Sequence, residues 1–334
     1  MIILTQGQGY AASLDFIGKD RVTLVDPTGS TSFDGLIDKS ETIPADAQEV
    51  LNFTNGIYSS PDSIGASALG FSINSYADVN LRIAQEIHLK IPALYKSSPA
   101  TPAVQIGKST WLETKPGVEY SVRGYWDGEE FGMFAITGRW NRALAGDVGP
   151  MLPGAIGTAF SILPHENPLK EQFDRLALYI AEKGDRFIGP VYITVIDDGT
   201  FMWYKDIYFG FRFPEEYSLS RLAPLGVPYT GAAKAFGKGY VVTTAVTLYD
   251  PAEINVDAVP PAQARLDNIV RRGDTIVSNG FKVGYAVGKG QTFAEAAEDA
   301  AQIAMLVCPD FGYRADAGKR AKEWYYHVRK RIKG

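Results

Sequence analysis

Two Asp-Gly dipeptides, Asp127-Gly128 and Asp198-Gly199, each separate two stretches rich in β-branched and aromatic residues. Asp-Gly is favoured in the tight turns of β-hairpins, because both residues tolerate the positive φ angles that these turns require. We therefore predict two antiparallel hairpins. The first is formed by VEYSVRGYW and EFGMFAIT, and the second by FIGPVYITVID and FMWYKDIYFGFRF.

Apolar residues recur at helical spacing in four other segments, which predicts four helices. These segments are Asn74–Lys90, Asn167–Lys183 and residues 292–307 and 315–332. We predict further strands in PAVQIG and at residues 240–249 and 276–287. The stretch 138–160, GRWNRALAGDVGPMLPGAIGTAF, is interrupted so often by glycine and proline that we expect a loop. The fold class is mixed α/β with antiparallel hairpins.

The N-terminal segment has the pattern of a small nucleotide-type α/β unit. MIILT and RVTLVDP are strand-like, and the Gly7-Gln8-Gly9 turn follows the first of them. Too few residues separate the two strands for a full crossover helix, so we expect an abbreviated lobe. A glycine turn that only packs tightly is favoured over a dinucleotide site. Residues 28–72 are expected to form loops with short strands.

Composition excludes several classes of function. With 334 residues, the chain exceeds the roughly 250–300 residues at which single cores stop growing, so we expect two or more lobes. With a net charge of −5, no global field attracts nucleic acid, so we do not expect it as a partner. The basic run Lys319–Lys333 is explained more simply by a solvated terminal helix than by a basic patch. The single cysteine, Cys308, excludes an internal disulfide, and a buried inert thiol is favoured over a nucleophile.

No stretch approaches 18 uninterrupted apolar residues, and Met1 leads directly into a strand-like segment. We therefore expect no membrane span, no signal peptide and a cytoplasmic location. The three histidines lie far apart and lack the spacing of metal ligands.

Residues 274–321 match three motifs in order: V-T-x-G-G-R-V-L, G-x-T-x-x-E-A and Y-R-x-D-I-G-x-R-A. On these motifs the chain resembles the glycinamide ribonucleotide synthetase (phosphoribosylamine–glycine ligase) family of ATP-grasp ligases. The matching residues are Val277, Asn279, Gly280, Val283, Gly290, Thr292, Glu295, Ala296, Tyr313, Arg314, Asp316, Gly318, Arg320 and Ala321.

Three further stretches are similar to the same family. Residues 138–160 resemble its D-H-K-R … D-x-G-P-N-T-G-G-M-G loop, and Glu113–Ser121 resembles E-E-x-x-x-G-x-E-x-S. Residues 187–216 resemble G-x-L-Y-x-G-L-M … E-x-N-x-R-F-G-D-P-E. The resemblance implies an ATP-grasp-like core at 71–230, a C-terminal β/α domain at 231–334 and the abbreviated lobe at 1–70. It assigns substrate binding to Arg142, Asp147, Gly149, Gly154, Gly157 and Arg212, and nucleotide binding to Glu113 and Glu119.

Two departures from the family affect the ATP side. Tyr208 and Gly210 stand where the family has the glutamate and asparagine that hold Mg²⁺. A phenol and a bare glycine are not the hard oxygen ligands that Mg²⁺ requires, so we expect no metal at these positions. The nearby carboxylates that remain as alternative ligands are Asp206, Glu215 and Glu216.

The second departure is a missing lid. Between Val104 and Trp111 the family inserts a β-rich lid with a glycine loop, whereas this chain has only QIGKST, with Lys108 as a possible remnant of that loop. ATP and Mg²⁺ are therefore expected as cofactors only if the reduced site still works.

Three hypotheses for function follow. The chain is a divergent enzyme that still joins an amine to a carboxylate; a non-catalytic protein that binds a phosphoribosyl, nucleotide or amino-acid ligand; or a structural subunit that docks onto a protein partner. Arg142 and Arg212 offer planar guanidinium groups suited to carboxylates and phosphates. Asp147 would accept a hydrogen bond from an amine or a ribose hydroxyl. The competing interpretation is that these arginines bridge acidic residues and the glycines serve turns.

Overall fold

The computed structural model describes most of the chain after residue 76. The described residues are 77–106, 110–183, 189–209, 212, 215–222, 236–248, 250–255, 258, 263–266, 269–278, 280–309 and 311–333. Before them, five short strands are described: β1 Ile2–Leu4, β2 Thr23–Val25, β3 Lys39–Ser40, β4 Glu49–Asn52 and β5 Ser67–Leu69.

The five N-terminal strands form one parallel sheet with the order β3-β2-β1-β4-β5. A parallel sheet in this order is the arrangement of nucleotide-type α/β lobes. The strands predicted at the chain start and at residues 21–27 are therefore confirmed. The Gly7-Gln8-Gly9 turn lies outside the described residues.

An eight-stranded sheet forms the centre of the molecule, in the order β13-β12-β9-β10-β11-β14-β18-β15. Its strands are β9 Val118–Trp126, β10 Phe131–Leu144, β11 Val148–Ser161, β12 Gly189–Asp197, β13 Met202–Phe209, β14 Tyr240–Thr247, β15 Ala264–Leu266 and β18 Lys282–Gly290. All neighbouring strands are antiparallel, and the two predicted hairpins are β9–β10 and β12–β13. Because β14 and β18 belong to this sheet, the C-terminal strands extend the core; the domain boundary near residue 230 remains a prediction.

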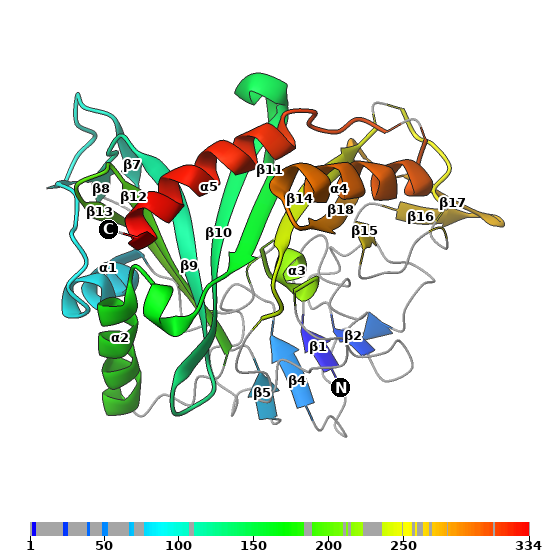
Figure 1. Ribbon diagram of the computed structural model, residues 1–334. Helices are drawn as coiled ribbons and strands as arrows, with labels where there is room; N and C mark the ends of the chain where they lie inside the picture. The colour runs from blue at the N-terminus through cyan, green and yellow to red at the C-terminus, as the bar shows by residue number, and fades with distance from the viewer. Residues whose placement is uncertain are drawn as a thin grey trace.

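Four helices cover one face of the large sheet: α1 Ala77–Glu86, α2 Lys170–Lys183, α4 Phe293–Val307 and α5 Ala317–Lys333. Figure 1 shows α4 and α5 lying across this face, and the two helices contact each other. The main core lies between helices and sheet, where Val122 and Ile193 meet Phe173, Leu176 and Trp324, among others. Each of the four helices overlaps a predicted one.

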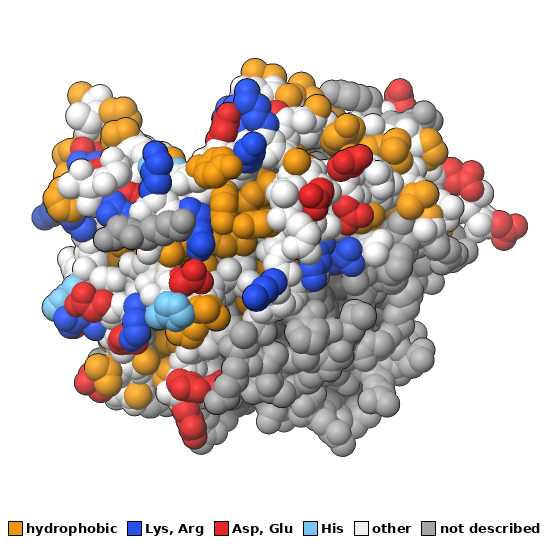
Figure 2. All heavy atoms as spheres, viewed as in Figure 1, with side chains coloured by type: hydrophobic (Ala, Val, Ile, Leu, Met, Phe, Trp, Pro, Cys, Tyr) orange, Lys and Arg blue, Asp and Glu red, His pale blue; other side chains and the backbone are white. Residues whose placement is uncertain are grey.

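The opposite face is called here the open face, because none of these four helices contributes to its apolar cluster. It carries the side chains that alternate with those of the helix-covered face. A smaller apolar cluster occupies part of it, where the short helix α3 Glu215–Ser220 packs on β11 and β14. On the face of the molecule drawn in Figure 2, positive and negative side chains are interspersed. That view shows no extended basic surface of the kind that nucleic acid requires.

The prediction of a loop at 138–160 is wrong, because these residues form the second half of β10 and nearly all of β11. The prolines of β11, Pro150 and Pro153, lie before Ile156, where pairing with β14 begins. This part of β11 pairs with β10 alone among the described strands. Proline is tolerated on such an edge, where its missing N–H removes no ladder hydrogen bond.

Gly138 lies in β10, where a glycine is required by packing. A Cβ atom at this position would lie 2.6 Å from Cε2 of Trp324, closer than two carbon atoms can approach. The glycine therefore lets the α5 tryptophan reach the sheet and does not mark a turn. Only the long-range packing of α5 reveals this role.

A three-stranded sheet, β6-β8-β7, is formed by β6 Leu94–Tyr95, β7 Ala103–Gln105 and β8 Trp111–Glu113. β7 confirms the strand predicted in PAVQIG, whereas β6 and β8 were not predicted. The strand predicted at 276–287 is two strands, because β17 Thr275–Ser278 pairs with β16 Ile269–Arg272 and only β18 joins the large sheet.

Candidate functional site

A row of polar side chains crosses the open face of the large sheet. Thr194 on β12 stands in register with Ser121 on β9 and Asp206 on β13, and Ser121 stands in register with Thr137 on β10. The hydroxyls of Ser121 and Thr194 are 2.8 Å apart, and both residues are buried. Polar groups are seldom placed at core positions of a sheet without a partner or a functional reason. The row therefore identifies this face as the candidate site.

Arg212, which follows β13, lies over this row. Its Nη1 donates to Thr194 Oγ1 at 2.9 Å and is 3.4 Å from Ser121 Oγ. Burial opposes the charge of Arg212, but the carboxylates of Glu215 and Asp206 outweigh it and raise the pKa of the guanidinium. Arg212 therefore stays a cation in a partly desolvated position, where its interaction with an anion is stronger than in water.

Arg139 on β10 approaches the same carboxylate as Arg212. Glu215 Oε1 is 3.4 Å from Arg212 Nε and 3.6 Å from Arg139 Nη1. Both distances exceed the donor–acceptor length of a strong charge-assisted hydrogen bond, which is about 2.7–2.9 Å. Among the described residues, the buried atoms Glu215 Oε2 and Arg139 Nε have no hydrogen-bond partner. The pair therefore presents one unsatisfied acceptor and one unsatisfied donor at the same place.

Asp206 is the second carboxylate of the open face. Burial raises its pKa, although Arg212 and Arg139 oppose this effect. Arg123 lies two residues after Ser121 on the same face, fully buried, and its Nη1 donates to the carbonyl of Met133 at 3.1 Å. Among these five charged groups, three are arginines and two are carboxylates. The local charge balance therefore favours an anion.

The residues matched to the family's substrate loop form the tip of the β10–β11 hairpin. Arg142 is exposed, and its Nη1 donates to the carbonyl of Gly149 at 2.9 Å. Gly149 and Gly154 have φ angles of 81° and 71°, which favour glycine. Gly157 stands in register with Arg139 and adds no side chain beside it.

The carboxylate of Asp147 is held by two arginines of the C-terminal segment. Arg314 Nη1 donates to it at 2.9 Å, and Arg320 Nη2 lies 3.1 Å away. Arg314, only 1% exposed, also binds Asp316 and the carbonyl of Arg142. This network anchors the hairpin tip to the start of α5. The ligand-binding role of Asp147 stays a prediction, since these contacts already supply a structural one.

The structure gives the two predicted arginines different surroundings. Arg142 belongs to the hairpin tip, and Arg212 belongs to the polar row. No contact among the described residues joins their side chains to a common partner. The shared substrate-binding role that the resemblance assigns to the two arginines therefore remains a prediction.

Arg139, by contrast, does share a partner with Arg212, and the sequence analysis missed it. The signal was the parity of β10: Arg139 is two residues from Thr137 and therefore lies on the same face. Reading the segment as a loop hid that parity.

Glu113 and Glu119, the predicted nucleotide-binding residues, line a common pocket of about 210 Å³. The pocket lies between the small β6-β8-β7 sheet and the strands β9, β12 and β13. Each acid is paired with a lysine: Glu113 with Lys115 at 2.7 Å, and Glu119 with Lys205. The hydrogen bond from Lys115 holds the pKa of Glu113 below its usual value. Leu112, Ile196 and Tyr204 give the pocket an apolar wall.

The positions of the family's metal ligands are only partly described. The ring of Tyr208 lies 6.4 Å from that of Tyr192, whereas Gly210 and Lys108 lie outside the described residues. The side chain of Glu216 is likewise outside them. Within the described part of the chain, no group of three or more His, Cys, Asp or Glu residues could hold a metal ion. No helix in that part is long and apolar enough to cross a membrane.

Comparison with solved structures identifies the fold. The phosphoribosylamine–glycine ligase of Thermotoga maritima matches with a TM-score of 0.71 and 15% identity, covering 95% of this chain and 100% of that chain. The N5-carboxyaminoimidazole ribonucleotide synthetase of Thermus thermophilus matches with a TM-score of 0.54 and 11% identity, covering 92% and 99%. The Aspergillus clavatus N5-carboxyaminoimidazole synthase, in complex with ADP and 5-aminoimidazole ribonucleotide, has a TM-score of 0.53 and 9% identity, covering 91% and 98%.

No protein-family model matches the sequence, and no curated protein matches it significantly. Identities this low establish the fold alone. The strand order, the antiparallel central sheet and these structural matches agree on one architecture. The chain has the ATP-grasp fold.

Proposed function

We propose that this chain is a divergent relative of the ATP-dependent carboxylate–amine ligases that binds a small anionic molecule on the open face of its large sheet. The observation that carries the proposal is the arrangement of Arg139 and Arg212 around Glu215. Two buried or half-buried guanidinium groups share one carboxylate at 3.4–3.6 Å. A ligand carboxylate or phosphate would be bound more strongly there than at the protein surface.

The unsatisfied atoms of this pair define the chemistry of the ligand. Among the described residues, Arg139 Nε lacks an acceptor and Glu215 Oε2 lacks a donor. An amino acid has both groups in its carboxylate and ammonium, and a phosphoribosyl compound has them in its phosphate and hydroxyls. The proposed ligands are therefore an amino acid, a phosphoribosyl compound or a nucleotide. Simple anions without a donor are expected to bind less tightly.

We further propose that binding of ATP with Mg²⁺ is weak. Ligase chemistry requires Mg²⁺ to neutralise the transferred phosphoryl group. Tyr208 replaces a carboxylate, and the described acids near the site, Asp206 and Glu215, both face arginines. Calorimetry tests this directly: a dissociation constant in the low micromolar range with one Mg²⁺ would contradict the proposal and support an active ligase.

A thermal-shift screen tests ligand binding. The panel contains glycine, ribose 5-phosphate, AMP, ADP and ATP with Mg²⁺, with inorganic phosphate as the anion without the organic donor groups. A ligand at 100 times its dissociation constant adds about 2.7 kcal/mol to the free energy of unfolding, which is readily measured. Hits are then titrated calorimetrically into the wild type and variants.

The matched variants are Arg139→Gln and the control Arg175→Gln on the exposed side of α2. Arg175 pairs with Glu171 far from the site. We expect Arg139→Gln to weaken binding of the hit about ten- to a hundredfold, since charge-assisted hydrogen bonds contribute about 1.5–3 kcal/mol. Arg175→Gln should leave affinity unchanged. No hit in the panel, or equal affinity in all three proteins, would reject this site and favour a structural or partner-docking protein.

A further inference from the structure

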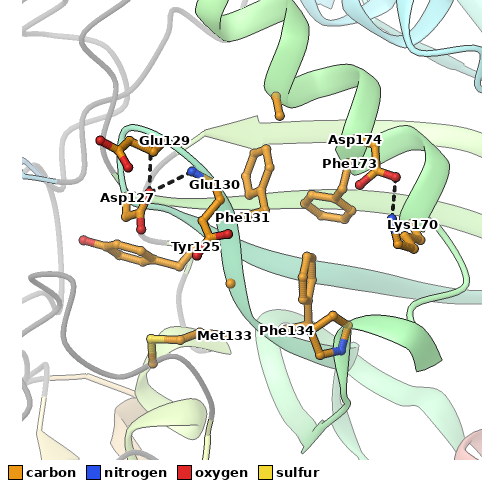
Figure 3. A pocket seen from close by; sticks show the side chains of 13 residues that line it. Tyr125, Asp127, Glu129, Glu130, Phe131, Met133, Phe134, Lys170, Phe173 and Asp174 are labelled. Carbon is orange, nitrogen blue, oxygen red and sulfur yellow. Dashed lines mark hydrogen bonds and ion pairs between the residues drawn. The ribbon is translucent and has the colours of Figure 1, made fainter.

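A second pocket lies away from the polar row, at the end of the sheet where the β9–β10 hairpin meets α2. Its volume is about 390 Å³, which is large enough for a small organic molecule. Figure 3 shows its walls: aromatic rings in the centre, an acidic turn at one end and the Lys170–Asp174 pair at the other. The pocket meets the site described above only through Arg123, which donates to the carbonyl of the lining residue Met133 and lies over the ring of Tyr125.

Three phenylalanines form the apolar wall. Phe173 of α2 meets Phe131 and Phe134 of β10 edge to face, with ring centroids 5.0 and 5.2 Å apart. Trp126 extends the cluster, its ring centroid 4.9 Å from that of Phe131. The rings close around Gly124, where an added Cβ would lie within 2.9 Å of Phe173 and Phe134. The wall is therefore built by tight packing of ring edges and faces, and Phe131 remains half-buried at its surface.

The other side of the pocket is strongly acidic. Asp127, Glu129 and Glu130 come from the hairpin turn, and Asp174 comes from α2. Asp127 Oδ1 accepts from the backbone N–H groups of Glu129 and Glu130, both at 2.9 Å, which fixes the shape of the turn. The cation among the lining residues, Lys170, is paired with Asp174 at 2.5 Å. Three carboxylates therefore lie on the turn at one end of the pocket, and the fourth, Asp174, lies beside Lys170 at the other end.

The backbone at the pocket is irregular. Met133, a lining residue, has a φ angle of 49°, and the pairing of β9 with β10 shifts between Gly132 and Ala135. Left-handed conformations cost a non-glycine residue on the order of 1–3 kcal/mol and cluster at ligand sites. A bulge of this kind bends the strand and increases its twist beside the pocket.

We propose that this pocket binds a small organic cation with an apolar body. The ammonium group would lie toward the acidic turn, and the apolar body would lie against Phe131. Aromatic faces attract cations as well as apolar groups, so both parts of such a ligand are accommodated by one wall. The carboxylates exclude anions of the same size by repulsion. This proposal is independent of the function proposed for the open face.

The experiment uses three probes of nearly equal size on the full-length protein. Phenethylamine is a cation, 2-phenylethanol is neutral and phenylacetate is an anion. Binding is measured by ligand-observed NMR and calorimetry. We expect phenethylamine to bind at least about tenfold more tightly than 2-phenylethanol, and phenylacetate to bind most weakly.

Three variants locate the binding site. Asp127→Asn/Glu130→Gln removes two charges while Asn keeps the acceptor that shapes the turn. This double substitution should weaken the binding of phenethylamine about fivefold or more and leave the affinity for 2-phenylethanol unchanged. Ala177→Phe, which fills the α2 side of the pocket, should remove binding of both. Glu171→Gln on the outer side of α2 is the control and should change neither.

Three results would contradict the proposal. Equal affinity for phenethylamine and 2-phenylethanol would show that the carboxylates play no part. Unchanged amine binding in Ala177→Phe would place the amine elsewhere on the protein. Absence of phenethylamine binding at millimolar concentration would remove the proposed site altogether. Circular dichroism of each variant verifies that it is folded before binding is compared.

Discussion

Replacing Arg331 near the end of α5 tests whether this helix is held by a buried ion pair. Arg331 binds the carboxylate of Asp197 through two bonds, Nε to Oδ2 at 2.9 Å and Nη2 to Oδ1 at 2.6 Å. Asp197 is only 1% exposed and also accepts from the Gly199 N–H at 2.9 Å. Removing Arg331 leaves a buried carboxylate without its main partner.

The expected loss can be bounded from these contacts. Breaking a buried ion pair by removing one partner costs about 3–5 kcal/mol. Arg331 is 25% exposed and the Gly199 N–H remains, so Arg331→Met should lie near the lower end, at about 2–3 kcal/mol. That loss lowers the melting temperature by about 3–4 °C. Arg329→Met is the control, because Arg329 and its partner Glu166 are both more than a quarter exposed. It should cost less than about 1 kcal/mol.

The pH dependence has a definite sign. Burial opposes ionisation of Asp197, but the bonds from Arg331 and the Gly199 N–H outweigh it and lower the pKa of the carboxyl. A lowered folded-state pKa contributes stability that is present above the unfolded value, about 3.9, and is lost as the pH falls through the folded value. The unfolded-state pKa is common to both proteins, so the difference between wild type and Arg331→Met should shrink as the pH falls through the higher pKa that buried Asp197 has without Arg331, and reach its minimum below the lowered wild-type pKa.

A double-mutant cycle with Asp197→Asn provides the decisive measurement, made by urea unfolding followed by circular dichroism. If an uncompensated charge causes the loss, Arg331→Met should cost far less in the Asp197→Asn background. Equal costs in both backgrounds, or a cost no larger than that of Arg329→Met, would refute the reasoning.

Three further predictions concern other contacts. Gly288→Ala should destabilise the protein by about 3 kcal/mol or more in urea unfolding, because a Cβ there would collide with the backbone of Ala296 and Ala300 in α4; a stable variant would contradict the packing. Arg314→Met should increase hydrogen exchange of residues 142–149 and lower stability by about 3 kcal/mol, since Asp147 and Asp316 lose the buried one of the two arginines that they share; unchanged exchange would argue against anchoring. If Arg142 contacts the ligand as the family resemblance predicts, Arg142→Ala should weaken ligand binding about ten- to a hundredfold in calorimetry with little change in melting temperature, whereas unchanged affinity with a large loss of stability would make Arg142 a structural residue.

Local patterns were enough to predict the hairpins and helices. Asp127-Gly128 and Asp198-Gly199 form the expected turns, because turn chemistry depends on the residues in the turn itself. The helix at Phe293–Val307 has the expected period and is capped by Thr292, whose side chain accepts from the Glu295 N–H. The ordered motifs of residues 274–321 indicated the ATP-grasp fold, which the structural matches confirm.

Only the tertiary structure decided the character of residues 138–160 and of the site. Glycine and proline predict a loop locally, but pairing with β10 and β14 and the approach of Trp324 to Gly138 stabilise a strand. Strand parity then places Arg139, and not the sequence-matched Arg142, beside Glu215 and Arg212. These partners lie about 70 residues apart in the sequence, and no local propensity encodes their contact. The residue types of the site were readable from the sequence, whereas their grouping on one face depended on long-range strand pairing.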